Sequence, residues 1–260
     1  MAQELDRRVA LVTGGGSGIG EGIARTLAAE GAAVAISGRR REVLDAVVAS
    51  IQEAGGQALA VTGDVSNSAD AANMVEATVE AFGDLHILVN NAGIARGGPV
   101  ESMSEGDIDA VIDIDLKGPV HMIRAALPHL EAHADSGGAS VINISSSVTQ
   151  TVLRNYSIYS AAKAGLDQLT RCLALDLAEK RVRINAICPG IVDTPIFQTV
   201  MPEAAAERFI RSAGGSTPLG RPGQPADIAQ LTLYLASARS EWMTGSILTL
   251  DGGISLAGNV

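Results

Sequence analysis

The chain has 260 residues, of which 47% are hydrophobic and 18% are charged, so disorder is excluded and a sizeable core is expected. Its 19 Lys+Arg against 29 Asp+Glu give a formal net charge of -10, which argues against nucleic-acid or anionic-membrane partners. We expect a single domain over residues 1–260, with no signal peptide and no membrane span. The two cysteines, Cys172 and Cys188, lack a Cys-x-x-Cys spacing, which indicates a reduced, cytoplasmic protein.

The first apolar run, residues 9–12, predicts a parallel strand that is covered on both faces. It leads directly into the loop Thr13-Gly14-Gly15-Gly16-Ser17-Gly18-Ile19-Gly20. Ile19, Ile23 and Leu27 then recur on one face of a helix. Strand, glycine loop and amphipathic helix in this order predict a pyrophosphate site at the helix N-terminus.

A second strand is predicted over residues 32–36, and the sequence after it reads Ser37-Gly38-Arg39-Arg40-Arg41. In dinucleotide folds an acidic residue at this point binds the ribose 2′-hydroxyl of NAD, whereas arginine accommodates the 2′-phosphate of NADP. Because no carboxylate stands here and guanidinium groups suit a phosphate, we favour NADP, with NAD as the alternative. The plainer alternative is that the arginines merely begin the next helix in solvent.

Five further strands are predicted over residues 57–62, 87–89, 140–144, 182–187 and 246–250, which makes seven in all. Helices are predicted over 103–130, 157–176 and 225–236, and Ser66 is expected to cap the helix that carries Met74. Pro119 and Pro128 are expected to bend or break the first of these helices. The apolar residues of 194–215 predict a helical flap that closes over a substrate.

Tyr159 and Lys163 lie four residues apart in the helix predicted over 157–176, so both side chains point from the same face. The lysine charge favours an ionised phenol, and we therefore expect the pKa of Tyr159 to fall below its ordinary value of about 10. Tyr159 would then serve as a proton donor or acceptor near neutral pH.

These motifs together resemble the short-chain dehydrogenase/reductase family over nearly the whole chain. They are the loop with Thr13, Gly14, Gly18 and Gly20, then Asn90-Asn91-Ala92-Gly93, Ser146, and Tyr159-x-x-x-Lys163. The resemblance implies an α/β fold: a Rossmann-type, doubly wound sheet of seven parallel strands with helices on both faces. It also implies hydride transfer between NADP(H) and a ketone or secondary alcohol.

The resemblance further assigns roles to individual residues. Ser146 would hydrogen-bond the substrate oxygen, Tyr159 would pass it a proton, and Lys163 would lower the tyrosine pKa and bind the nicotinamide ribose. The pyrophosphate, adenine, ribose and carboxamide of the cofactor would be held by Gly14, Ser17, Gly18, Ile19, Gly20, Asp64, Val65, Asn91, Ala92, Gly93, Pro189, Gly190, Val192 and Thr194.

One position departs from the family pattern. The family has Asn-Leu-x-Gly where this chain has Asp115-Leu116-Lys117-Gly118, and the asparagine there helps to hold a water in a proton relay to the lysine. An ionised Asp115 would weaken the effect of Lys163 on Tyr159. Alternatively, the backbone carbonyl of Asp115 carries the relay and the side chain matters little.

Two histidines and the two cysteines are not assigned a chemical role. His129 and His133 are four residues apart but have no third ligand at a suitable spacing, so we expect surface histidines and no metal. Cys172 is expected on the apolar face of its helix, and both cysteines are interpreted as packing residues.

The substrate is less well defined by the sequence. The expected pocket residues are mostly apolar and indicate a hydrophobic or aromatic small molecule; they are Ile94, Arg96, Gln150, Leu153, Tyr156, Ile196, Phe197, Met201 and Phe209. A 3-oxoacyl-[acyl-carrier-protein] reductase is one rival, although residues 130–136 lack the Lys or Arg that an acidic carrier would need. Sugar and hydroxysteroid dehydrogenases, and a non-catalytic nucleotide-sensing protein, are the others.

The resemblance also implies a homotetramer that pairs the long helices, with a homodimer as the alternative. The stripe Leu166, Leu169, Leu173 and Leu177 would serve such an interface, or equally the core.

Overall fold

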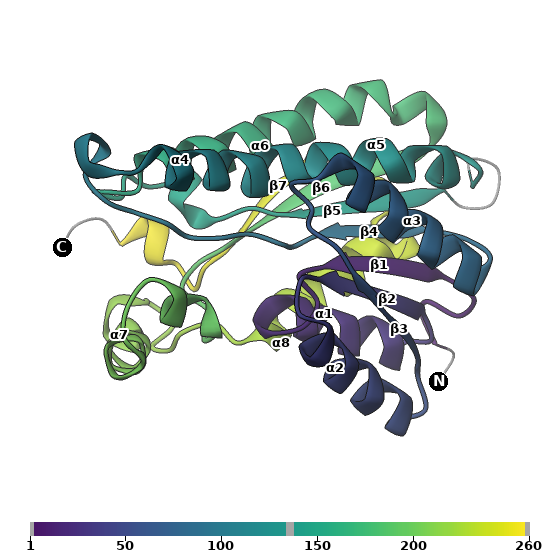
Figure 1. Cartoon of the computed structure of the whole chain (residues 1–260), viewed down its shortest axis with the longest axis horizontal. Helices are drawn as coiled ribbons and strands as arrows, with labels where there is room; N and C mark the ends of the chain where they lie inside the picture. Colours follow the sequence, from purple (N-terminus) through teal and green to yellow (C-terminus); the bar gives the residue numbers. More distant parts are fainter. Residues whose placement is uncertain (1–2, 134–137, 258–260) are drawn as a thin grey trace.

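A computed structural model gives the structure of the protein, which is described here for residues 3–133 and 138–257. The seven predicted strands form one parallel sheet in the order β3-β2-β1-β4-β5-β6-β7 (Figure 1). Their bounds are β1 Val9–Thr13, β2 Ala33–Gly38, β3 Gln57–Thr62, β4 Ile87–Asn90, β5 Ala139–Ile144, β6 Val182–Pro189 and β7 Ile247–Leu250. The fold class expected from the sequence is confirmed.

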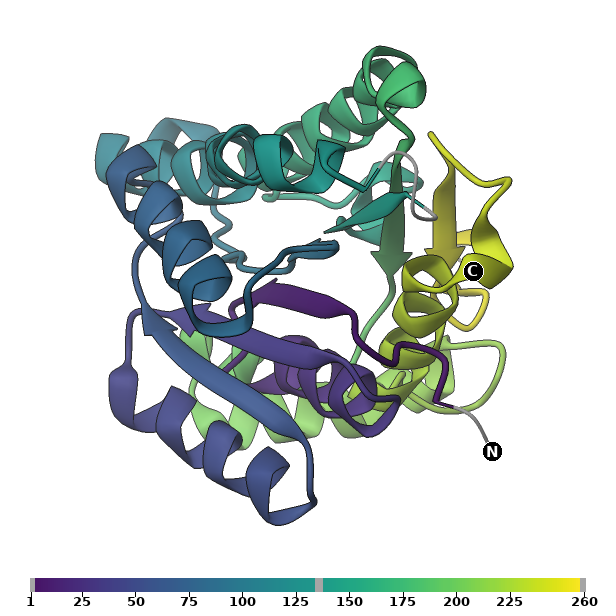
Figure 2. The ribbon, with the colours of Figure 1, turned by 90° about the vertical axis from the view of Figure 1, so that its right-hand side faces the viewer.

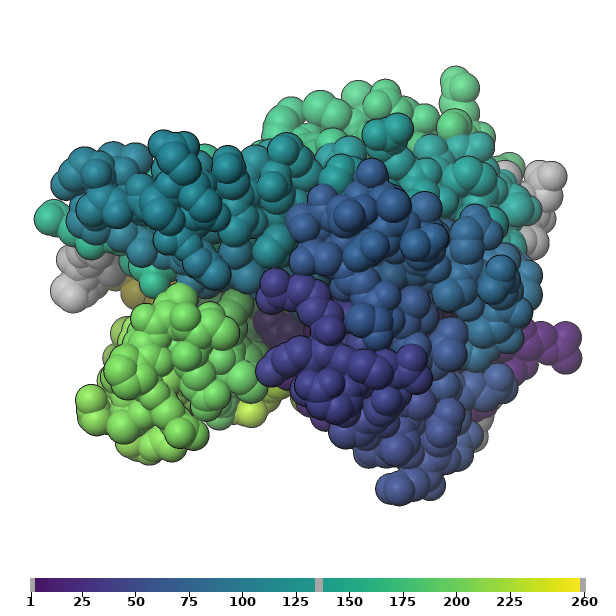
Figure 3. Space-filling model, viewed as in Figure 1, coloured from purple at the N-terminus to yellow at the C-terminus, as the bar shows by residue number. Residues whose placement is uncertain are grey.

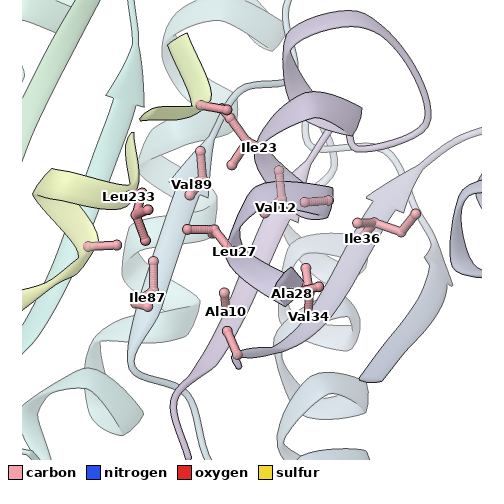
Figure 4. Packing of buried hydrophobic residues seen from close by; sticks show 14 of the residues in the cluster. Ala10, Val12, Ile23, Leu27, Ala28, Val34, Ile36, Ile87, Val89 and Leu233 are labelled. Atoms are coloured by element: carbon pink, nitrogen blue, oxygen red, sulfur yellow. The ribbon is translucent and has the colours of Figure 1, made fainter. Parts of the chain in front are cut away.

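Helices cover both faces of this sheet. On one face lie α1 (Gly18–Ala29), α2 (Arg41–Glu53) and α8 (Pro225–Ala236), and on the other lie α3 (Ser68–Phe82), α4 (Glu105–Ile112), α5 (Gly118–Glu131) and α6 (Ser157–Asp176) (Figures 1 and 2). The predicted helices over 157–176 and 225–236 are confirmed. The side chains of β1 alternate between the two faces, so Ala10 and Val12 enter one core (Figure 4), whereas Leu11 enters the other.

The long helical region 105–131 contains one π-helical turn, Asp113–Lys117, between α4 and α5. Neither proline ends it, contrary to one of the outcomes expected. Pro119 lies at the start of α5, directly after the π turn, and Pro128 lies inside the helix. A π turn inside an α-helix displaces one residue from the regular register, and functional sites often use it.

Asn67, and not Ser66, caps α3. The Asn67 side chain accepts hydrogen bonds from the N–H groups of Ala69 and Asp70, so the sequence interpretation of this cap was wrong by one residue. The reason is local: the Ser66 hydroxyl donates to Asp64 Oδ1 at 2.7 Å.

The segment predicted as a flap forms a 3₁₀ turn, Pro195–Thr199, and helix α7, Glu203–Ser216. The two pieces pack on each other through Phe197 and Phe209, whose ring centroids are 5.0 Å apart. Figure 3 shows α7 as a separate green lobe, with a hollow between it, the teal residues of α4 and the purple residues near the N-terminus. Among the described residues, no helix is long and apolar enough to cross a membrane.

Candidate active site

The glycine loop after β1 is held tightly against the loop after β4. Gly14 and Gly18 have φ angles of 64° and 56°, which residues with a Cβ rarely adopt. Asn91 Nδ2 donates to the carbonyl oxygens of Thr13 and Gly14 at 2.9 and 3.2 Å. A Cβ on Gly20 would lie 2.3 Å from the Gly14 oxygen, so only glycine allows this approach.

The start of α1 suits an anion. Ser17 stands at the N-cap in an extended conformation, and its side chain makes no cap hydrogen bond to the first-turn N–H groups of α1. Those groups and the helix dipole attract negative charge. A Cβ on Gly18 would lie 3.1 Å from Thr194 Cβ, so the 194–215 segment begins directly against this loop. The residues present therefore fit the pyrophosphate of a dinucleotide.

The loops after β2 and β3 meet at the other end of this site. Arg39 and Arg40 are exposed, and Arg39 Nη1 lies 3.9 Å from Asp64 Oδ2. Partial burial of Asp64 opposes ionisation, but hydrogen bonds from Ser66 and the charge of Arg39 lower the pKa of Asp64 overall. Val65 is only 7% exposed and packs in the core, so its side chain is not open to a ligand.

The loop after β4 is fixed by a hydroxyl. Thr13 Oγ1 accepts hydrogen bonds from the N–H groups of Asn91 and Ala92, each at 3.0 Å. Thr13 was part of the recognised motif but not among the predicted site residues. Gly93 follows, and a Cβ there would lie 2.7 Å from Asp115 Oδ1.

The loop after β6 is enclosed on both sides. Pro189 ends β6, and a Cβ on Gly190 would lie 2.7 Å from Asp251 Cβ. Val192 is buried and pairs with Gly223 in a short parallel bridge. Thr194 is therefore held between the core and the glycine loop.

Lys163 reaches the base of the site from α6. Its Nζ is almost fully buried, donates to the Ile144 carbonyl at 3.0 Å and lies 5.9 Å from the centroid of the Tyr159 ring. Ser146 caps the 3₁₀ turn Ser147–Thr149 that follows β5. A hydrogen bond between its hydroxyl and Tyr159 lowers the pKa of the tyrosine. The structure thus brings Ser146, Tyr159 and Lys163 together, as the resemblance implied.

The side chain of Asp115 joins this group from the π turn. It is completely buried, and its Oδ1 lies 3.0 Å from Lys163 Nζ. Its Oδ2 accepts a hydrogen bond from the Ile94 N–H at 3.2 Å. Asp115 is therefore a direct ion-pair partner of Lys163, which favours the first of the two interpretations drawn from the sequence.

The expectation that the pKa of Tyr159 falls below its ordinary value is wrong for this structure. Burial is the largest influence and raises the pKa of Tyr159, while Lys163 lowers it and Asp115 raises it again. Burial lowers the pKa of Lys163, but Asp115, Tyr159 and Asp167 together outweigh this and the pKa is raised. Burial also raises the pKa of Asp115, against the opposing charge of Lys163. The helical spacing revealed the lysine but not the carboxylate beside it.

The predicted substrate residues differ in their accessibility. Ile94, Tyr156 and Phe197 are half-buried, whereas Gln150 and Leu153 are exposed. Arg96 forms an ion pair with Asp107 of α4, so its charge is partly neutralised. Residues 134–136 of the stretch that weighed against a carrier protein lie outside the described residues.

The structure contradicts the expectations for His133 and for Cys172. His133 is buried and not at the surface: its Nε2 lies 2.7 Å from Asp84 Oδ1, and its ring stacks on His86 at 3.9 Å. Ligand atoms of these three residues lie within 4.8 Å of one another. The Val9 N–H donates to His86 Nδ1 at 3.1 Å, however, so in the neutral ring Nε2 carries the proton and offers no lone pair to a metal.

The second correction concerns the cysteines. Cys172 is exposed rather than packed, because it stands on the solvent side of α6. Cys188 is buried as expected, with its Sγ 3.8 Å from both carboxylate oxygens of Asp167. Burial, with the charge of Asp167, raises the pKa of Cys188 to about 11.

Comparison with known proteins agrees with this geometry. A family model described as "Enoyl-(Acyl carrier protein) reductase" (adh_short_C2) matches residues 14–255. The 2,5-dichloro-2,5-cyclohexadiene-1,4-diol dehydrogenase of Sphingobium indicum is 38% identical over 98% of this chain and 99% of its own. The cis-4-hydroxycyclohexanecarboxylate dehydrogenase of Sinomonas cyclohexanicum is 38% identical over 97% and 98%.

A solved dehydrogenase/reductase from Sinorhizobium meliloti 1021 superimposes with a TM-score of 0.87, at 38% identity and 97% coverage of both chains. The relatives are named as dehydrogenases or reductases with different substrates, so they define the reaction class and not the substrate. The family uses a nicotinamide cofactor. The protein is therefore an oxidoreductase that belongs to the short-chain dehydrogenase/reductase family.

Proposed function

We propose that this protein uses NADP(H) to interconvert a hydrophobic ketone and its secondary alcohol. The observation that carries the proposal is the Tyr159 ring beside the buried Lys163 ammonium, whose Nζ lies 5.9 Å from the ring centroid. An acid–base group of this kind, together with a glycine loop that would bind the cofactor pyrophosphate, is the combination that carbonyl reduction needs.

The cofactor would be held by residues from four loops. The first turn of α1 would bind its pyrophosphate, and Asp64, Asn91 and Thr194 would contact its adenosine and nicotinamide ends. Arg39 and Arg40 support NADP over NAD, because both are exposed and no acidic residue lies between the end of β2 and the start of α2. NAD remains the alternative.

Ser146, Tyr159 and Lys163 would stabilise the charge that develops on the substrate oxygen and transfer the proton to it. When bound, the reduced nicotinamide supplies a hydride to the carbonyl carbon, and negative charge develops on the carbonyl oxygen. Ser146 donates a hydrogen bond to this oxygen, and Tyr159 transfers its phenolic proton to it. Lys163 then stabilises the phenolate until it regains a proton from solvent. In the oxidation direction the same phenolate accepts the proton of the alcohol.

A secondary alcohol on a six-membered carbon ring is the substrate class we favour. Two relatives are named for such rings, a cyclohexadienediol and a hydroxycyclohexanecarboxylate. The half-buried wall residues Ile94, Tyr156 and Phe197 present carbon surface that suits a ring. The 194–215 segment would close over it.

We also propose a cytoplasmic homotetramer. The leucine stripe of α6 does not support it, because Leu166 and Leu177 are buried in this chain's own core. Leu175 and Trp242 give better support, with 81% and 98% of their surfaces exposed. Sedimentation of the purified protein would give the number of subunits.

The proposal is tested by following NADPH oxidation with cyclohexanones, aryl ketones, acetoacetyl thioesters, keto sugars and oxosteroids, and NADP reduction with the matching alcohols. We expect the highest kcat/KM with the ring ketones. Preference for the thioester would favour a 3-oxoacyl-[acyl-carrier-protein] reductase. NADPH binding without turnover of any compound would contradict catalysis and favour a nucleotide sensor.

A further inference from the structure

Two loops that the sequence separates by more than fifty residues are joined next to Tyr159. The Gly98 N–H, in the loop after β4, donates to the Asn155 carbonyl at 2.6 Å. Asn155 has a φ of 66°, a left-handed conformation that costs energy for most residues with a side chain. This conformation lets its carbonyl face Gly98 just before α6 begins.

Gly97 packs against the ring of Tyr156, the residue that follows Asn155. A Cβ on Gly97 would lie 2.8 Å from Cζ of the Tyr156 ring and 2.7 Å from the Asn155 oxygen. The second of these atoms is backbone, so a side chain at position 97 would push the two loops apart. The neighbouring Gly98 is different, since a Cβ there would meet only Met103 Cγ, at an ordinary 3.5 Å.

Tyr156 in turn contacts the tyrosine at the centre of the site. The ring centroids of Tyr156 and Tyr159 are 6.3 Å apart, with an interplanar angle of 76°. This edge-to-face arrangement is one that aromatic pairs prefer, and it restricts rotation of both rings. The Ser160 N–H donates to the Tyr156 carbonyl at 2.8 Å, so the backbone of Tyr156 is fixed to the first turn of α6.

We propose that Tyr156 is a positioning and specificity-determining residue, seated by Gly97 and Asn155 against Tyr159. Its ring holds the Tyr159 phenol in one orientation and forms a flat wall on which a ring-shaped substrate lies. The proposal rests on the proposed function, because it assigns the substrate wall of that same site. Tyr156 was among the pocket residues expected from the sequence, whereas its contacts with Gly97 join segments that lie far apart in the sequence.

The flat ring of Tyr156 is expected to discriminate between substrates by their shape. A cyclic ketone contacts a flat ring over its whole face, whereas an open-chain ketone of the same carbon number loses more freedom when it binds there. Replacing Tyr156 by leucine keeps apolar volume but removes the flat surface. The phenylalanine variant keeps the ring and should therefore keep the preference for the cyclic ketone, because no hydrogen bond from the Tyr156 hydroxyl supports the arrangement in the described part of the chain.

The experiment compares Gly97→Ala with its matched control Gly98→Ala, and Tyr156→Leu with Tyr156→Phe. We expect Gly97→Ala to lower kcat/KM for cyclohexanone about tenfold or more, with an unchanged Kd for NADPH, whereas Gly98→Ala stays within about twofold of the wild type. Tyr156→Leu should reduce the preference for cyclohexanone over hexan-2-one, and Tyr156→Phe should retain it. Equal losses in the two glycine variants, or an unchanged preference in Tyr156→Leu, would overturn the proposal.

Hydrogen exchange separates this proposal from the proposed function. The amide of residue 98 should exchange slowly in the wild type and in Gly98→Ala, and faster in Gly97→Ala, whether or not any ketone is reduced. Fast exchange at residue 98 in the wild type would contradict the link between the loops. Slow exchange together with no turnover of any ketone would reject the proposed function but keep the seating of Tyr156.

Discussion

Asp115 and Lys163 form a buried ion pair with 3.0 Å between Oδ1 and Nζ, and only 0% and 5% of their side chains are exposed. The carboxylate offsets much of the lysine charge that would otherwise act on Tyr159. Burial is the main cause of the raised pKa of Tyr159, and Asp115 adds to it. The phenol is therefore protonated at neutral pH, which is the form that a reduction requires.

Asp115→Asn tests this relationship through the pH dependence of oxidation, in which Tyr159 acts as a phenolate. The variant removes a negative charge and so favours the phenolate, and the rising limb of kcat against pH should move toward acid. Asp113→Asn is the control, since Asp113 lies on the same π turn but pairs with Lys117 near the surface. Superimposable curves for Asp115→Asn and wild type would remove the carboxylate from the account.

Arg39→Ala tests the choice of cofactor. If the Arg39 guanidinium binds the 2′-phosphate, its loss should raise the Kd for NADPH about tenfold or more and leave the Kd for NADH unchanged. Arg41→Gln is the control, because Arg41 already pairs with Asp45 at 2.8 Å. Titration of each variant with both nucleotides measures the effect. An equal weakening for NADPH and NADH would argue against a phosphate contact.

The cysteines should differ in reactivity. Cys188 is buried, and the raised pKa of about 11 keeps it as a thiol at pH 8, whereas Cys172 is exposed. Brief treatment of the folded protein with iodoacetamide should therefore add one group, at Cys172. Mass spectrometry of the peptides would show it, and modification of Cys188 at a similar rate would contradict the burial described.

His86 should make the protein less stable in mild acid. Burial, and next the charge of His133, lower the pKa of His86 to about 4, from 6.5. The unfolded chain therefore binds the proton first, and stability is lost as pH falls from about 6.5 toward 4, by about 1–3 kcal/mol. Asp84, which raises this pKa, and Arg8, which lowers it, face the same ring.

His86→Asn measures this contribution. Its amide oxygen can accept the Val9 N–H in place of Nδ1 but does not titrate. The slope of unfolding free energy against pH, obtained from urea unfolding, should be smaller in this variant than in the wild type. His129→Asn, at a more exposed histidine beside Glu76, should keep the wild-type slope. The same slope in His86→Asn would assign the acid sensitivity to other groups.

The fold was predictable from the sequence because it depends on local patterns. Each buried parallel strand is a short apolar run, and α6 and α8 follow their helical periodicity to the residue. The Asn67 cap shows the limit of this method, since Ser66 and Asn67 are both good capping residues and only the hydrogen bond of Ser66 to Asp64 decides between them.

The site was predictable only in part, because its energetics depend on contacts between distant segments. The spacing of Tyr159 and Lys163 is local and was recognised. The 3.0 Å approach of Asp115 requires the π turn before α5, and the burial of His133 requires His86 at the start of β4. Neither of these contacts follows from residue order, and both alter the pKa of a neighbouring group: Asp115 raises that of Tyr159, and His133 lowers that of His86.

Tyr159→Phe tests the central claim most directly. The variant keeps the ring against Tyr156 and removes only the proton, so NADPH binding should be unchanged while the rate of ketone reduction falls about 10²–10⁴-fold. Tyr234→Phe, a tyrosine on α8 beside Arg239, should reduce ketones at the wild-type rate. An undiminished rate in Tyr159→Phe would show that another group supplies the proton.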